Sequence, residues 1–146
     1  MYKNILLPVD GSEVATHAAN EGLKLASALG SSVTFLYVVD ISVITIPDAE
    51  SGIANIEIIR KGFMEQGQKL LAALSSSAGE KGVKAQSFIA EGDVHDEIIK
   101  AAEEKDADLI VMGTHGRRGL NRLLLGSVAE SVARRAHCPV LLIRPA

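Results

Sequence analysis

Five short runs of apolar residues, separated by polar and charged stretches, set the pattern of this chain. The runs lie at 4–9, 32–39, 85–90, 108–113 and 139–144. Each is bounded by turn-forming or charged residues, which predicts a β-strand. The runs are rich in Val, Ile and Leu, the residues typical of parallel strands that are buried on both faces.

Four segments between these runs repeat small and apolar residues at the three- and four-residue steps of an α-helix. They cover 15–29, 56–79, 94–102 and 128–136. The first carries alanine and glycine on one face, which lets a helix lie close to a sheet. Asp93 directly precedes the third segment and is expected to be its N-cap.

Strand and helix alternate along the whole chain, which predicts the α/β class. Right-handed crossovers would join the strands into one parallel sheet with helices on both faces. A length of 146 residues fits a single domain, 1–146, with a full hydrophobic core. Because 47% of the residues are hydrophobic but only 3% are aromatic, that core is expected to be aliphatic.

The interval 40–55 breaks this regularity. It contains Pro47 and Gly52 and is interpreted as a long insertion between the second strand and the second helix. A passive surface loop is the simpler interpretation. A lid over a binding site or a contact between subunits is the alternative.

Charge and composition exclude several classes of protein. The formal net charge of -3 argues against general binding to nucleic acid or to membrane surfaces. Cys138 is the one cysteine, so no intrachain disulfide can form, and its place before Pro139 predicts a buried, unreactive thiol. No window approaches the length of a membrane span, and the first apolar run is too short for a signal peptide. We expect a soluble, cytoplasmic protein.

The glycine-rich stretch GTHGRRGLNRLLLGSV, 113–128, follows directly on the fourth predicted strand. Ligands of doubly wound sheets bind beyond the carboxyl ends of the strands, so the stretch begins where a cleft is expected. Gly126 and Ser127 open the last helix, whose unpaired N–H groups and positive dipole end can hold an anion. Gly113 and Gly116 would let the chain turn sharply and let a ribose or phosphate pack against main chain. The alternative is that the glycines serve only turns and a helix cap. Ser127 could be the N-cap of the helix or could donate its hydroxyl to a phosphate.

The stretch is not one of the two common phosphate-binding loops. No lysine follows Gly126, so there is no Walker P-loop. A Rossmann dinucleotide fingerprint would follow the first strand, where the chain has only the short segment DGS. The stretch therefore matches neither of these two motifs.

The spacing Gly113-x2-Gly116-x9-Gly126-Ser127 resembles the signature of the nucleotide-binding branch of the universal stress protein family. The resemblance extends along the chain through NILLPVDGSE, FLYVVD, GDVHDEII and the terminal CPVLLIR. It implies a Rossmann-like domain of the adenine nucleotide alpha hydrolase type, with five parallel strands in the order 3-2-1-4-5. It also implies a bound ATP or related adenine nucleotide. A homodimer through the last strand is expected, since that apolar edge needs a partner, and a tetramer is left open.

The resemblance assigns binding roles to individual residues. Pro8 and Asp10 would line the adenine and ribose side, and Val38 would meet adenine through its backbone groups. Asp10 has an equal alternative as N-cap of the first helix, paired with Glu13. The ribose and the α-phosphate would lie against Met112, Gly113, Thr114, His115, Gly116, Arg117, Arg118 and Gly119. The β- and γ-phosphates would be held by N–H groups of Gly126, Ser127 and Val128.

Several charged or ionisable side chains near this stretch could have either of two roles. Arg117 and Arg118 could neutralise phosphate charge or lie on the surface. His115 would contact a phosphate or turn to solvent, and Asp40 is interpreted as a solvated strand end. We expect no metal site built by the protein alone, and His95 is interpreted as a surface or capping residue. A Mg²⁺ or Mn²⁺ ion could be carried on the phosphates, with water and Asp10 as further ligands.

These features predict an ATP-binding universal stress protein that acts as a nucleotide-dependent regulatory module. Its partner would be a membrane transporter or another stress-response protein, as the family resemblance implies. The alternative is a slow ATPase or another nucleotide-using enzyme. No lysine at the phosphate helix and no base for an attacking water are evident, so binding is expected to act through conformation.

Overall fold

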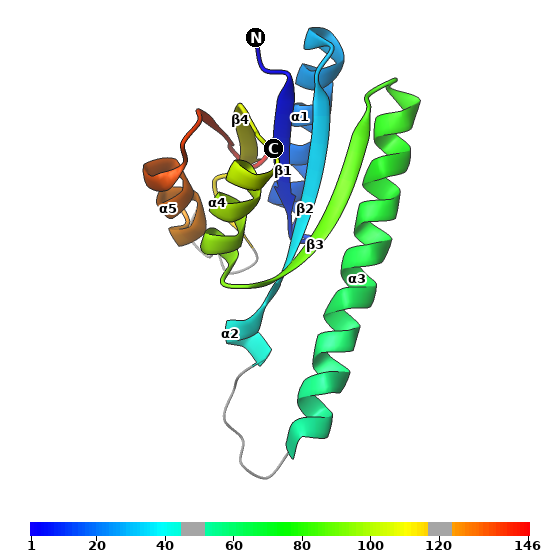
Figure 1. Cartoon of the computed structure of the whole chain (residues 1–146), viewed down its shortest axis with the longest axis vertical. Helices are drawn as coiled ribbons and strands as arrows, with labels where there is room; N and C mark the ends of the chain where they lie inside the picture. Colours follow the sequence, from blue (N-terminus) through cyan, green and yellow to red (C-terminus); the bar gives the residue numbers. More distant parts are fainter. Residues whose placement is uncertain (45–51, 117–123) are drawn as a thin grey trace.

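The computed structural model describes residues 1–44, 52–116 and 124–146. Its five strands form one sheet in the order β3-β2-β1-β4-β5, and every pairing is parallel (Figure 1). The strands are β1 Asn4–Val9, β2 Ser32–Asp40, β3 Ala85–Gly92, β4 Leu109–Gly113 and β5 Val140–Ile143. The predicted α/β class and strand order are confirmed.

Helices cover both faces of the sheet. They are α1 Glu13–Leu29, α2 Ile41–Ile44, α3 Gly52–Glu80, α4 Val94–Glu104 and α5 Ser127–Arg135. The sheet separates α1 and α3 from α4 and α5 (Figure 1). Across the described ranges, none of the helices combines the length and the apolar character needed to cross a membrane.

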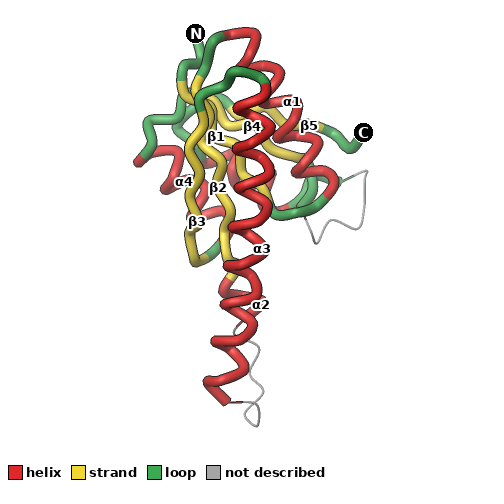
Figure 2. The backbone as a smooth tube through the Cα atoms, turned by 90° about the vertical axis from the view of Figure 1, so that its right-hand side faces the viewer, coloured by secondary structure: helices red, strands yellow, loops and turns green. Residues whose placement is uncertain are grey.

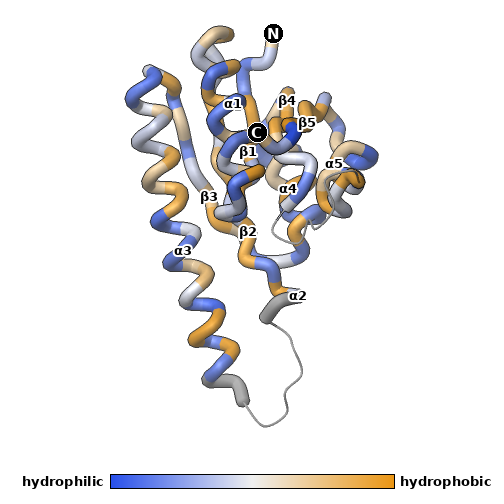
Figure 3. The backbone as a smooth tube through the Cα atoms, turned by 180° about the vertical axis from the view of Figure 1, so that it is seen from behind, coloured by the Kyte–Doolittle hydropathy of each residue, from blue (hydrophilic) through white to orange (hydrophobic). Residues whose placement is uncertain are grey.

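Two hydrophobic cores lie against the two faces of the sheet. Successive strand residues alternate between them: Ile5 and Leu7 pack with α1 and α3, while Leu6 packs with α4 and α5. This alternation follows from the two-residue period of a strand. Hydrophobic positions continue along β2, whereas α3 alternates between hydrophobic and hydrophilic residues (Figure 3). Burying one such aliphatic side chain contributes about 1.5–3 kcal/mol, so the doubly covered strands dominate the stability.

The small-residue face of α1 is buried as expected. Gly22 lies so close to β1 that a Cβ there would be 2.5 Å from Leu7 Cδ2. The N-cap of the helix is Ser12, whose hydroxyl accepts from the N–H of Ala15 at 3.2 Å. The suggestion that Asp10 caps α1 is therefore wrong. Asp10 instead accepts a hydrogen bond at 2.8 Å from the N–H of Ser12, the N-cap residue itself.

The interpretation of 40–55 as one irregular insertion is wrong in part. Residues Ile41–Ile44 form α2, and Asp40 supports its start by accepting from Ser42 N at 2.9 Å and Ser42 Oγ at 2.6 Å. The helix α3 already begins at Gly52 and extends well beyond the sheet (Figure 2). Residues 45–51 lie outside the described part of the chain.

Cys138 is partly buried. Burial, followed by the nearby Asp108 carboxylate, raises the pKa of its thiol above the ordinary value. The protonated thiol is therefore the dominant form at neutral pH, and the thiolate is the reactive species. The predicted burial of Cys138 is thus only partial, and its low reactivity stays a prediction.

Two glycines of α3 provide a matched test of how α3 packs on the sheet. A Cβ at Gly67 would lie 2.6 Å from Cδ1 of Tyr37, a ring that is only 2% exposed, whereas a Cβ at Gly62 would meet nothing within 4 Å. Gly67→Ala should lower the free energy of unfolding by about 1–2 kcal/mol, because overpacking outweighs the gain in helix propensity. Gly62→Ala should raise it by about 0.5–1 kcal/mol. Urea titrations would measure both; a stabilised Gly67→Ala would contradict the close contact.

Candidate functional site

A cavity of about 460 Å³ lies at the carboxyl edge of the sheet. Its walls come from the ends of β1, β2 and β4 and from the first turns of α4 and α5. Its size is that of a small-molecule pocket. The crossovers diverge at this edge, which is where sheets of this kind bind ligands.

Most of the residues assigned to nucleotide binding line this one cavity. They are Pro8, Asp10, Val38, Met112, Gly113, His115, Gly116, Gly126, Ser127 and Val128. Thr114 does not line it, but its carbonyl accepts from the N–H of Gly126 at 2.8 Å. Arg117, Arg118 and Gly119 lie outside the described residues, as does the neighbouring Arg122.

Close approach of neighbouring atoms, and not a positive φ, is what requires glycine in this stretch. None of Gly113, Gly116 and Gly126 has a positive φ. A Cβ at Gly113 would lie 2.7 Å from Val14 Cγ1, and one at Gly126 would lie 2.9 Å from the carbonyl oxygen of Thr114. A Cβ at Gly116 would come within 3.1 Å of Asp10 Oδ2. The chain does bend directly after β4, at Thr114. The bare backbone at the three glycines brings the neighbouring chain segments close together.

The N-terminus of α5 borders the cavity. Its N-cap is Gly126, with φ -62° and ψ 151°, and this residue makes no side-chain cap hydrogen bond. Ser127 is the first helical residue, so its expected role as N-cap is wrong. The helix ends with Arg134 and Arg135, which complement the negative end of its dipole. The positive end of α5 is therefore directed toward the cavity without a capping side chain.

His115 is held inside the protein. It is 8% exposed, its Nδ1 lies 2.9 Å from Thr114 Oγ1, and its Nε2 bonds the carbonyl oxygen of Leu124. The alternative that the ring turns to solvent is wrong.

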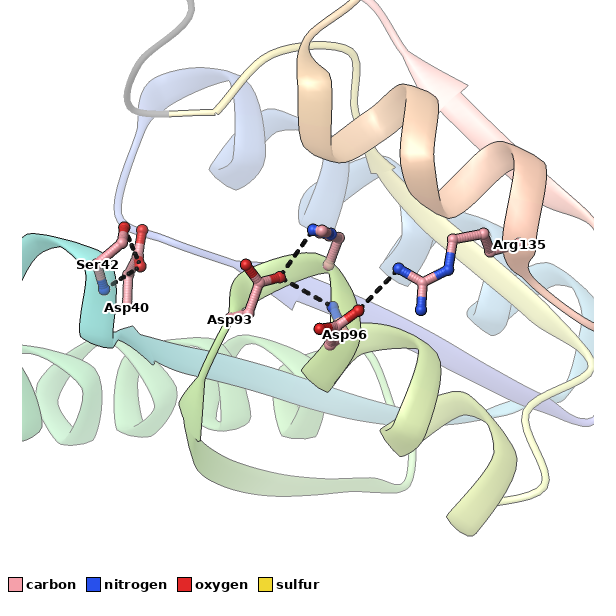
Figure 4. Close-up of polar contacts among 6 residues, drawn as sticks. Asp40, Ser42, Asp93, Asp96 and Arg135 are labelled. Carbon is pink, nitrogen blue, oxygen red and sulfur yellow. Dashed lines mark hydrogen bonds and ion pairs between the residues drawn. The ribbon is translucent and has the colours of Figure 1, made fainter.

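The cavity also has an acidic side that sequence reasoning largely missed. Asp40 and Asp93 line it together with Asp10. Asp93 accepts from the N–H of Asp96 at 3.3 Å, which confirms it as the N-cap of α4 (Figure 4). The signal was available: these residues follow parallel strands, whose carboxyl ends share an edge. None of the described lining residues is lysine or arginine.

His95 also lines the cavity, where sequence reasoning placed only a surface or capping residue. Its Nε2 lies 2.9 Å from Asp93 Oδ1, and its Nδ1 is buried without a hydrogen-bond partner among the described residues. Asp93, His95 and Asp96 bring ligand-type atoms within 4.8 Å of one another. Asp96 is paired with Nη1 of Arg135 at 2.8 Å, which links α4 to α5 (Figure 4).

The Asp93 cap can be tested by a matched pair of variants. Asp93→Ala removes the acceptor for the N–H of Asp96 and should lower the free energy of unfolding by about 1 kcal/mol. Asp93→Asn keeps a side-chain oxygen that can accept this bond, so its free energy of unfolding should fall much less. Urea unfolding of both variants would measure the difference; equal losses would contradict a capping role.

Proteins of similar sequence and fold identify the family of this chain. The model of the universal stress protein family matches residues 1–144. Universal stress protein MJ0531 of Methanocaldococcus jannaschii is 44% identical over 144 residues, which cover 99% of this chain and 83% of that protein. The solved structure of MJ0577, from the same organism, superposes with a TM-score of 0.88 at 31% identity and covers 98% of this chain and 96% of that one.

Two more distant structures share the fold and contain ligands. A universal stress protein in complex with cAMP has a TM-score of 0.74 at 23% identity, with 99% of both chains covered. A protein of the same family from Arabidopsis thaliana with AMP bound has a TM-score of 0.72 at 20% identity, covering 99% of this chain and 92% of that one. By the family match over nearly its whole length and by its sequence relatives, this chain belongs to the universal stress protein family.

Proposed function

We propose that this protein binds ATP in the cavity at the carboxyl edge of the sheet and acts as a nucleotide-dependent regulatory module. The observation that carries the proposal is the N-terminus of α5, which begins at Gly126 without a capping side chain and borders that cavity. Such a helix end favours phosphate, because its N–H groups and its dipole both attract an anion. Family members of the same fold hold cAMP and AMP, which supports an adenine nucleotide.

The two sides of the cavity suggest the orientation of the nucleotide. Pro8 and Val38 end neighbouring strands and would pack against adenine, with Val38 offering its backbone groups. The carboxylate of Asp10 would accept from a ribose hydroxyl. The α-phosphate would lie along Gly113–Gly116, and the β- and γ-phosphates would meet Gly126 and the residues after it.

A divalent cation would be carried on the phosphates. Mg²⁺ and Mn²⁺ prefer oxygen ligands and are commonly bound by one or two carboxylates together with substrate phosphates. Asp10 lines the cavity and offers a carboxylate of this type. The ion would offset phosphate charge on a cavity whose described walls carry Asp10, Asp40 and Asp93.

A regulatory role fits the lining better than rapid catalysis. Fast phosphoryl transfer requires cationic groups on the phosphates and a residue that orients the attacking water. Among the described lining residues, none is lysine or arginine. The binding free energy would therefore bias the conformation presented to a partner, such as a transporter or another stress-response protein.

The ATP proposal is tested by the variant Gly126→Val. A side chain here meets the Thr114 carbonyl at the start of α5, so the helix end should move away from the phosphates. The affinity for ATP should fall roughly 10- to 100-fold, the loss expected for charge-assisted hydrogen bonds. Calorimetry would measure it, and denatured wild-type protein should release an adenine nucleotide.

The matched control is Gly62→Ala, a glycine replacement in open space on α3, which should leave ATP affinity unchanged. Unchanged ATP affinity in Gly126→Val would refute the phosphate assignment. Multiple turnovers of ATP that scale with protein concentration would favour the enzymatic alternative.

We also propose a homodimer through β5. This strand is one edge of the sheet, and Leu141 on it is 42% exposed. An apolar edge strand invites pairing with another strand, and a two-fold partner presents the same edge in antiparallel register.

Leu141→Lys should convert the dimer to a monomer, because a charge would be buried at the centre of the paired edges. Leu29→Lys replaces a similarly exposed leucine at the end of α1 and should not affect assembly. Sedimentation velocity would measure both. A monomeric wild-type protein, or a Leu141→Lys variant that stays dimeric, would contradict this interface.

A further inference from the structure

The ring of His115 joins the two described ends of the glycine-rich stretch. It follows β4 directly, and its Nε2 bonds the carbonyl oxygen of Leu124, nine positions further along the chain. A second link runs beside it, from the N–H of Gly126 to the carbonyl oxygen of Thr114 at 2.8 Å. These two bonds hold the residues before α5 against the end of β4.

The chemistry of the two contacts defines the tautomer of the ring. A backbone carbonyl can only accept, so Nε2 carries the proton and donates to Leu124. In the neutral imidazole Nδ1 is then an acceptor, and it takes a hydrogen bond from the hydroxyl of Thr114 at 2.9 Å. Both nitrogens are therefore engaged within the protein, and the ring is 8% exposed.

The two ends of the stretch are anchored very differently. The first is fixed by packing: Gly113 lies against Val14, and the N–H of Thr114 donates to the Ile143 carbonyl at 3.0 Å. The second is less packed just before α5, where Leu124 is 65% exposed and Leu125 is 43% exposed. The hydrogen bonds from His115 and from Gly126 are its described links to the end of β4.

We propose that His115 is a positioning residue that sets the separation between the two halves of the phosphate site. The inference rests on the proposed nucleotide function. His115 acts through Leu124 on the start of α5 and not by giving a ring nitrogen to the nucleotide. Because the first half is anchored independently, loss of the bridge should affect ligands that reach α5 and spare those that do not.

ATP and AMP separate these two effects. AMP would use the first half of the site alone, whereas ATP would also use the second. His115→Asn can still bond Thr114 but is too short to reach Leu124, so its affinity for ATP should fall about tenfold, the upper range for one hydrogen bond. Its affinity for AMP should fall several-fold less than its affinity for ATP, because the first half keeps its own anchors.

Three further variants sharpen the test. His115→Gln is long enough to donate to the Leu124 carbonyl and should recover most of the ATP affinity. Thr114→Val removes the hydroxyl that orients the ring and should weaken ATP binding about threefold, and AMP binding by less than that. His137→Asn changes an exposed histidine and should have no effect. Calorimetry with each nucleotide, alongside thermal unfolding, supplies the readout.

The outcomes distinguish the bridge from the function on which it rests. A wild-type protein that binds neither nucleotide would overturn the proposed function itself. A wild type that binds ATP together with a His115→Asn variant of equal ATP affinity would overturn the bridge alone. Equal losses for ATP and AMP would also overturn it, since they indicate general packing damage. If His115→Asn does not fold, unchanged ATP affinity in Thr114→Val would count against the bridge.

Discussion

The burial of β1 on both faces is the constraint on which the rest of this structure depends. It pairs with β2 on one side and β4 on the other, and its side chains supply both hydrophobic cores. Because α1, which follows β1, and α5, which follows β4, cover opposite faces of the sheet, the crossovers diverge between the carboxyl ends of β1 and β4. The cavity beside Pro8 and Asp10 lies at this divergence. Its position is therefore a consequence of covering the central strands on both faces.

The cavity has walls of both electrostatic characters. Carboxylates at the ends of the first two strands and before α4 are acidic, and the N-terminus of α5 is positive. A ligand with hydroxyl donors at one end and phosphates at the other is complementary to both. The proposed phosphate contacts use backbone N–H groups at this helix end, so the proposal gives the bridge from His115 its importance.

Much of the fold could be predicted from the sequence because its signals are local. Apolar runs bounded by turn residues locate the five strands, and the alternation with helical segments leaves few topologies for a parallel sheet. The glycine-rich stretch can be placed at the cavity edge because it directly follows the fourth of these strands. The errors arose where two local signals compete: Asp10 and Ser12 are both good capping residues, and so are Gly126 and Ser127. Which one caps depends on backbone angles that a sequence pattern does not encode.

The sequence by itself determined the fold class, the strand order expected from family resemblance, and the edge at which a ligand would bind. The tertiary structure decided what each polar side chain faces. His115 could have pointed to ligand, solvent or backbone, and only the approach of Leu124 makes it a bridge. Asp93 and His95 line the cavity because α4 begins beside it, although α4 and the glycine-rich stretch before α5 are far apart in the sequence. A hydrogen bond is made or lost when its two atoms move by a few tenths of an ångström. The periodicity of hydrophobic residues in the sequence does not depend on such small shifts.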